Sequence, residues 1–251
     1  MDISDSAPKD IDGSGGTPLV LLHGWLDSRR SWDLVVEHLA AERRVVAVTF
    51  RGWGDAANEG TYSIDACAED VVALLDSMSI KSAVLAGHSM GTLVATAVAA
   101  RAPDRVAALV LAGATAKMRP EHVLDPSDGT TSADIAPMCQ GWATTGVDEA
   151  VLRSFQLDDL KPFVEAGTTP KAFADQVMVE TLKADVRAHG ECWQSMLDED
   201  HSAELAEVAL PVLIVWGTAD GVFVASLRRL YLENWQTALF YMGGYGPPCM
   251  S

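Results

Sequence analysis

The chain has 251 residues, of which 49% are hydrophobic and 21% charged, a balance typical of a globular protein with a large buried core. Its formal charge of −17 disfavours nucleic acids and anionic membranes as partners, because phosphate binding needs clustered lysine and arginine. No apolar run approaches ~18 residues, and residues 1–10 have neither a basic start nor an apolar stretch, so we expect no membrane span and no secretory signal.

The four cysteines lie far apart in the sequence and form no spacing typical of a metal site or a redox motif. They are Cys67, Cys139, Cys192 and Cys249. We therefore expect free thiols in a cytoplasmic protein that uses no metal and no cofactor.

Strand and helix patterns alternate through the first part of the chain. Residues 1–16 are polar, acidic and rich in glycine and serine, and we expect them to be poorly ordered. After them, short apolar runs predict parallel strands at 18–23, 44–50, 81–86 and 106–112, and helical spacing predicts helices at 31–41, 62–78 and 90–101. This alternation favours an α/β fold with a doubly wound, mostly parallel sheet and helices on both faces.

The alternation stops at about residue 115 and resumes near residue 206. Between these points no strand pattern stands out, and helical stretches occur at 148–157, 171–182 and 186–197. After them we expect a strand at 211–217, a helix at 222–235 and a last strand at 238–242. The predicted organisation is therefore a first core part (17–115), a helical insertion (116–205) and a second core part (206–251).

One motif lies where a predicted strand passes directly into a predicted helix: Gly87, Ser89 and Gly91 in the pattern Gly-x-Ser-x-Gly. Such a turn takes only about three residues and forces its central residue into a strained backbone conformation. The bend is tolerable only when the residues two before and two after carry no side chain, and Gly87 and Gly91 meet this condition. The sequence predicts a Ser89 hydroxyl that projects from the sheet above its own helix N-terminus. A chance match in another α/β protein is the alternative.

With three further motifs in the same order, the chain resembles the α/β-hydrolase family over residues 18–246. These are His23-Gly24-Trp25 after the first strand, Arg51-Gly52-Trp53-Gly54 after the second, and Trp216-Gly217-Thr218-Ala219-Asp220 after a late strand. The resemblance implies that the helical insertion is a cap over the serine. Its apolar residues either line a substrate pocket or pack the cap onto the core.

The resemblance also implies roles for individual residues. Serine catalysis needs a nucleophile, an oriented base and donors for the oxyanion. Ser89 is the implied nucleophile, the backbone N–H groups of Trp25 and Met90 are the implied oxyanion donors, and Asp220 is the implied acid that orients the base. Asp220 alternatively caps the helix that follows it. Gly24, Gly87 and Gly91 are the motif glycines, the side chains of Trp25 and Met90 shape a narrow acyl site, and we expect structural roles for His23 and His88.

The chain departs from the family pattern at both ends. The hairpin that precedes the first strand is missing or vestigial, and so is the last helix. The position of the basic histidine is Pro247, and no histidine follows His201. His201 is expected at the other end of the sheet from Ser89, whereas His122 and His189 belong to the cap and could reach in.

Two hypotheses explain the missing base: the family sequence is cut short before its histidine, or catalysis has been lost. Uncovered sheet surface at the two ends would lead either to a homodimer or to poor solubility. The leading functional hypothesis is a serine hydrolase that cleaves a small carboxylic ester or lactone through a Ser89 acyl-enzyme, with impaired activity. The alternative is a non-catalytic small-molecule-binding or interaction protein on the same fold.

Overall fold

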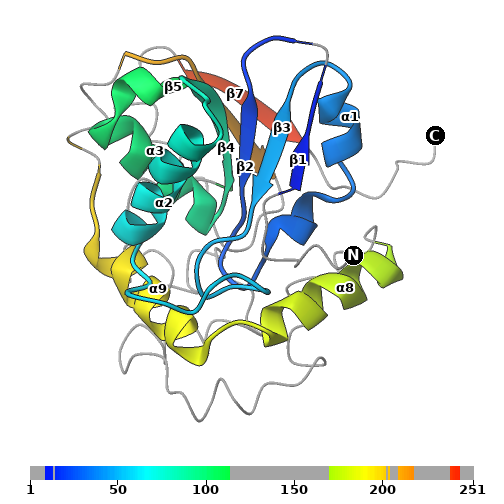
Figure 1. Ribbon diagram of the computed structural model, residues 1–251, viewed down its shortest axis with the longest axis vertical. Coiled ribbons are helices and arrows are strands. Elements are labelled where there is room, and N and C mark those ends of the chain that lie inside the picture. The colour runs from blue at the N-terminus through cyan, green and yellow to red at the C-terminus, as the bar shows by residue number, and fades with distance from the viewer. Residues whose placement is uncertain are drawn as a thin grey trace.

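A seven-stranded sheet forms the centre of the computed structural model, which describes residues 9–13, 15–113, 170–201, 203, 209–217 and 238–243 (Figure 1). Its strand order is β1-β3-β2-β4-β5-β6-β7. The strands are β1 (Lys9–Ile11), β2 (Leu19–Leu22), β3 (Val45–Val48), β4 (Ala83–His88), β5 (Val106–Ala112), β6 (Val212–Gly217) and β7 (Ala238–Gly243). All neighbouring pairs are parallel except β1 and β3, so the predicted, mostly parallel α/β sheet is confirmed.

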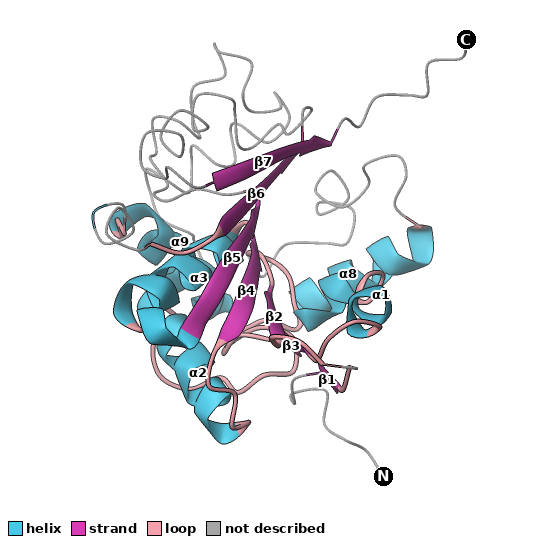
Figure 2. Cartoon of the chain, turned by 90° about the horizontal axis from the view of Figure 1, so that it is seen from above, coloured by secondary structure: helices cyan, strands magenta, loops and turns pink. Residues whose placement is uncertain are grey.

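Helices cover both faces of this sheet (Figure 2). On one face lie α2 (Ile64–Ser77) and α3 (Met90–Arg101), and on the other lies α1 (Val36–Ala40), whereas α8 (Lys171–Leu182) and α9 (Val186–Asp198) lie beyond the strand ends, at the bottom of Figure 1. Successive side chains of a strand point to opposite faces, and β2 follows this rule. Val20 and Leu22 pack with α2 and α3, whereas Leu19 and Leu21 pack with α1.

The central elements have the bounds that the sequence predicts. Helix α3 runs from Met90 to Arg101, and β5 runs from Val106 to Ala112. Every residue of α3 from Met90 to Ala99 is buried, because the helix packs against α2 as well as β4 and β5. A helix that is apolar all round is typical of such an enclosed position.

The predicted helix at 31–41 is wrong in its bounds. A 3-10 helix, Arg29–Trp32, comes first because the Ser28 hydroxyl accepts a hydrogen bond from the Arg30 amide and starts the turn early. The α-helix begins only at Val36. Since Val36 and Ala40 then face the sheet, the side chains of Leu34, Val35 and Leu39 are exposed.

The N-terminal segment is also more ordered than predicted. Residues 9–11 form β1, which pairs antiparallel with β3 at the edge of the sheet. Asp10 anchors the strand, because its carboxylate accepts hydrogen bonds from Arg44 Nε and Nη2 at 2.9 and 2.6 Å. Strand pairing uses backbone groups, so a segment with few large aliphatic residues can still form an edge strand. Residues 1–8 lie outside the described residues, and the missing first hairpin stays a prediction.

Helices α8 and α9 fall within the predicted cap segment and lie against the loops that follow β2 and β3 (Figure 1). The Asp185 amide donates to the Gly52 carbonyl at 2.8 Å, and the Tyr62 hydroxyl donates to the Asp185 carboxylate at 2.7 Å. The predicted helices at 148–157 and 222–235, the boundaries after residues 115 and 205, and the chain after residue 243 lie outside the described residues. None of the described helices is long and apolar enough to cross a membrane.

Candidate active site

Ser89 forms the tight turn between β4 and α3, as the motif predicts. Its backbone has φ +49° and ψ −117°, a strained conformation for a residue with a side chain. A Cβ atom on Gly87 would lie 2.3 Å from the Gly91 carbonyl oxygen, and one on Gly91 would lie 2.3 Å from the Leu22 carbonyl oxygen. Only glycine fits at these two positions. Ser89 itself is half-buried, so the turn places it at the edge of the core rather than inside it.

The loop after β2 passes directly beside this turn. A Cβ atom on Gly24 would lie 3.3 Å from Ser89 Cβ and 3.0 Å from His88 Nδ1, so a larger residue at Gly24 would press against the serine. Trp25 follows in the chain, and its half-buried side chain packs against the core. Met90 is the first residue of α3, where backbone N–H groups have no partner within the helix.

The side chain of Met90 differs from the prediction. It is almost fully buried among the core residues, so it packs inside the protein instead of shaping a pocket. Trp25 is the other large side chain that was expected to narrow the acyl site, and it is half-buried.

His23 has the structural role that the sequence predicts. Its Nδ1 lies 2.7 Å from the Gly24 carbonyl oxygen, and its Nε2 accepts a hydrogen bond from the Phe50 amide at 3.1 Å. These partners fix the neutral tautomer with the proton on Nδ1. Burial lowers the pKa of His23 to about 4, although the hydrogen bond to Gly24 opposes the shift. The neutral imidazole, hydrogen-bonded at both ring nitrogens, holds the start of the loop after β2 in place.

Asp27 is a residue near Ser89 that the sequence analysis missed. Its Oδ2 lies 3.4 Å from the position of a Gly24 Cβ atom and 3.8 Å from His88 Nδ1. Burial raises the pKa of the Asp27 carboxyl, and the nearby His88 opposes the shift. Ser89, His88 and Asp27 therefore converge on Gly24. The signal available in the sequence was an acidic residue three positions after Gly24, in a loop at the carboxyl end of a strand.

Comparison with known proteins identifies the family. A family model described as the alpha/beta hydrolase fold matches residues 17–235. The chain belongs to the alpha/beta-hydrolase family. Its strained serine turn, parallel sheet and flanking helices are those of this fold, which confirms the resemblance inferred from the motifs.

Relatives within the alpha/beta-hydrolase family differ in what they do. The chain is 33% identical to the dihydrolipoyllysine-residue acetyltransferase component of the acetoin cleaving system of Pseudomonas putida; the match covers 88% of this chain, which spans only 56% of that relative's length. It is 29% identical to the pimeloyl-[acyl-carrier protein] methyl ester esterase of Aliivibrio salmonicida, with 92% and 86% of the two chains covered. The solved structure of the esterase EaEST from Exiguobacterium antarcticum has a TM-score of 0.75 at 22% identity, with 95% and 88% covered.

Four aromatic side chains join the loops after β2 and β3 to helix α9: Trp25, Trp53, His189 and Trp193. The ring of Trp25 lies 5.0 Å from that of Trp193 and 5.8 Å from that of His189, measured between centroids. The His189 ring also lies edge-on to Trp53 at 4.8 Å. His189 is buried in this cluster, and burial lowers its pKa to about 4, although a hydrogen bond to the Thr181 backbone opposes the shift.

The two described cysteines lie together, although their separation in the sequence gave no sign of this. Cys67 in α2 and Cys192 in α9 are both buried free thiols. Contact with the Cys192 thiol, together with burial, raises the pKa of Cys67 well above its usual value. The pair therefore packs as small apolar side chains at the junction of these two helices.

Among the described residues, Asp65, Glu199 and His201 bring one ligand-type atom each within 4.8 Å of one another. Ion pairing accounts for this cluster. Asp65 also pairs with Arg101, and His201 Nε2 lies 3.2 Å from Glu199 Oε2. Asp220, Pro247 and His122 lie outside the described residues, so the positions of the implied acid and of the histidine slot stay predictions.

Proposed function

We propose that this alpha/beta hydrolase cleaves a small carboxylic ester or lactone, with Ser89 as the nucleophile. The observation that supports the proposal most is the strained turn at Ser89. Neighbouring backbone atoms leave no room for side chains at Gly87 and Gly91, on either side of the turn. The fold also holds Ser89 in a strained backbone conformation that an ordinary helix start does not need. Strain of this kind is stored where it serves a function.

The chemistry follows from the elements around the turn. Ser89 Oγ attacks the carbonyl carbon and gives its proton to a base, and the carbonyl oxygen becomes an oxyanion. The backbone N–H groups of Trp25 and Met90 donate to this oxyanion, and the N-terminal end of α3 favours its negative charge. The bond to the alcohol oxygen then breaks, the alcohol leaves with the proton that Ser89 gave up, and the acyl-enzyme remains. Water hydrolyses the acyl-enzyme to the free carboxylic acid and restores the Ser89 hydroxyl. The acid that would orient a histidine base in the family pattern is Asp220.

Pro247 occupies the position at which the family pattern has the histidine base, and its side chain takes no proton. The proposal therefore includes impaired catalysis, limited by the weakness of proton removal from Ser89. An oxyanion site and substrate binding alone can still give about 10³–10⁴-fold acceleration over water. The same residue favours the second candidate function, a small-molecule-binding protein on this scaffold without catalysis.

Labelling with a fluorophosphonate probe tests the proposal. We expect slow covalent labelling of the wild-type protein at Ser89, no labelling of Ser89→Ala, and unchanged labelling of Ser77→Ala, which alters an exposed serine of α2. A series of p-nitrophenyl esters of rising acyl length then defines the substrate. A folded wild-type protein that stays unlabelled would reject the hydrolase and favour the binding function.

A further inference from the structure

The loop after β2 contains a strained residue, Leu26, in addition to Ser89 in the turn between β4 and α3. Leu26 has φ +68°, in the left-handed region that residues with side chains rarely adopt, and its side chain is buried. This conformation is unfavourable for a residue with a side chain, so contacts elsewhere must hold it. Leu26 directly follows Trp25, the proposed oxyanion donor, and the backbone turn at Leu26 therefore influences where the Trp25 amide points.

Two contacts from α8 and α9 hold this loop. The Thr181 hydroxyl, at the end of α8, lies within hydrogen-bond distance of two carbonyl oxygens: that of Leu26 and, at 3.1 Å, that of Val177 one turn earlier in α8. Its one hydrogen is donated to the Leu26 carbonyl oxygen in competition with the Val177 carbonyl oxygen. The Trp25 indole N–H donates to the His189 carbonyl oxygen in α9 at 3.1 Å. Thr181 is 5% exposed, so water does not compete freely for its hydrogen bond.

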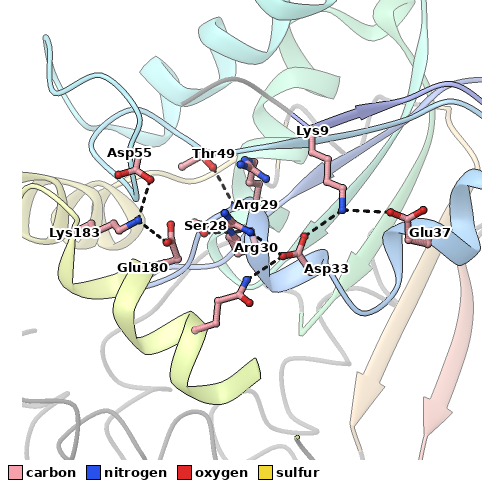
Figure 3. Close-up of polar contacts among 11 residues, drawn as sticks. Lys9, Ser28, Arg29, Arg30, Asp33, Glu37, Thr49, Asp55, Glu180 and Lys183 are labelled. Atoms are coloured by element: carbon pink, nitrogen blue, oxygen red, sulfur yellow. Dashed lines mark hydrogen bonds and ion pairs between the residues drawn. The ribbon is translucent and has the colours of Figure 1, made fainter. Parts of the chain in front are cut away.

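Polar contacts before and after Thr181 attach α8 to neighbouring segments, and Figure 3 shows those of Lys183 with Asp55 and Glu180. Gln176 Nε2 donates to Asp33 Oδ2 at 3.0 Å, which attaches the middle of α8 to the segment after the 3-10 helix. Lys183 Nζ lies 3.0 Å from Asp55 Oδ2 in the loop after β3 and 2.8 Å from Glu180 Oε1. Thr181 lies between these attachments, so its hydroxyl has little freedom to move away from Leu26.

We propose that Thr181 is a positioning residue: by holding Leu26 in its left-handed conformation, it aims the backbone N–H of Trp25 at the oxyanion formed on Ser89. The Trp25–His189 hydrogen bond assists from α9. This inference rests on the proposed function. It assigns to α8 and α9 the task of organising the oxyanion donors, in addition to covering the site.

The test compares Thr181→Val, which removes the hydroxyl, with Thr181→Ser, which keeps it. Thr96→Val is the matched control, because the buried Thr96 hydroxyl also donates to a carbonyl, that of Leu93, but within α3. We expect Thr181→Val to lower kcat about tenfold or more with KM changed less than about threefold, since a displaced donor weakens transition-state binding. Thr181→Ser stays within about twofold of wild type, as does Thr96→Val.

A second measurement does not depend on activity. Hydrogen exchange of the amides at residues 24–28 is expected to be faster in Thr181→Val than in wild type and Thr96→Val. Trp25→Phe, which keeps the backbone amide but loses the indole N–H, is expected to show the same kcat loss and faster exchange, and it serves if Thr181→Val fails to fold. Unchanged kcat and exchange in these variants would overturn the inference. If the wild-type protein is not labelled at Ser89, the proposed function fails, and exchange alone decides whether Thr181 holds the loop.

Discussion

At the scale of single residues, backbone strain marks the candidate site. Ser89 and Leu26 are two of the three non-glycine residues with positive φ in the described part of the chain, the third being Ser79 after α2. Gly24 lies next to Ser89 and precedes Leu26 in the same loop. Burial has raised the pKa of Asp27 at the same place. These features cost stability, and the packed core beneath them supplies the compensation.

The strain at Ser89 predicts different stabilities for two variants that both lack the hydroxyl. Ser89→Gly removes Cβ and relieves the strain, which we expect to raise the free energy of unfolding by about 1 kcal/mol after the larger chain entropy of glycine is subtracted. Ser89→Ala keeps Cβ and should stay within about 0.5 kcal/mol of wild type. Urea unfolding of the three proteins measures both values. Equal stability of the two variants would mean that the turn is not strained.

At the scale of elements, the sequence predicts the bounds of a helix or strand best where neighbouring elements enclose it on all sides. Helix α3 and strand β5 have their predicted bounds because each is enclosed by neighbours. The prediction failed at 31–41, where the Ser28 cap decides where a helix begins, and at β1, where backbone pairing replaces apolar burial.

The residues of the candidate site likewise divide into those that the sequence predicts and those that it does not. Ser89 and Gly87 are predictable because the constraint that selects them lies within a few residues of chain. Gly91 is predictable from its place in the motif, although the atom that excludes a side chain there is the distant Leu22 carbonyl oxygen. Thr181 and Asp27 are not, because their roles arise from contacts with residues distant in the sequence or from burial that the fold creates.

Docking of α9 on α2 gives a prediction at this scale. Ser195 Oγ accepts a hydrogen bond from the Ile64 amide at 2.9 Å, so α9 satisfies the first backbone donor of α2 in a buried position. Ser195→Ala leaves this donor without its partner and should lower the free energy of unfolding by about 1–3 kcal/mol. Ser77→Ala, at an exposed site of α2, should change it by less than about 0.5 kcal/mol. Denaturant unfolding checks both, and equal effects would show that the Ser195 contact contributes nothing.

At the scale of the whole molecule, two neutral histidines lie at the places where the layers meet. His23 holds the loop after β2 to the sheet, and His189 lies between α9 and Trp53. Both have pKa values lowered to about 4, mainly because burial disfavours the charged imidazole. The packing of the loop after β2 and of α9 against the rest of the core therefore depends on uncharged imidazoles at His23 and His189. This dependence links the stability of the fold to pH.

This link gives a signed prediction. Between pH 6.5 and 4 the unfolded chain binds a proton at each of these histidines and the folded chain does not, so the free energy of unfolding falls as the pH is lowered through this range. Each histidine contributes a loss of at most about 1.4 kcal/mol per pH unit, or about 2 kcal/mol between pH 7 and 5. His189→Phe keeps an aromatic ring and cannot bind the proton, so its loss of stability from pH 7 to pH 5 should be smaller than that of wild type by about 2 kcal/mol. His38→Gln, at an exposed position, should retain the wild-type dependence. Denaturant unfolding at the two pH values measures these differences, and a His189→Phe variant as acid-sensitive as wild type would show that His189 is not neutral in the fold.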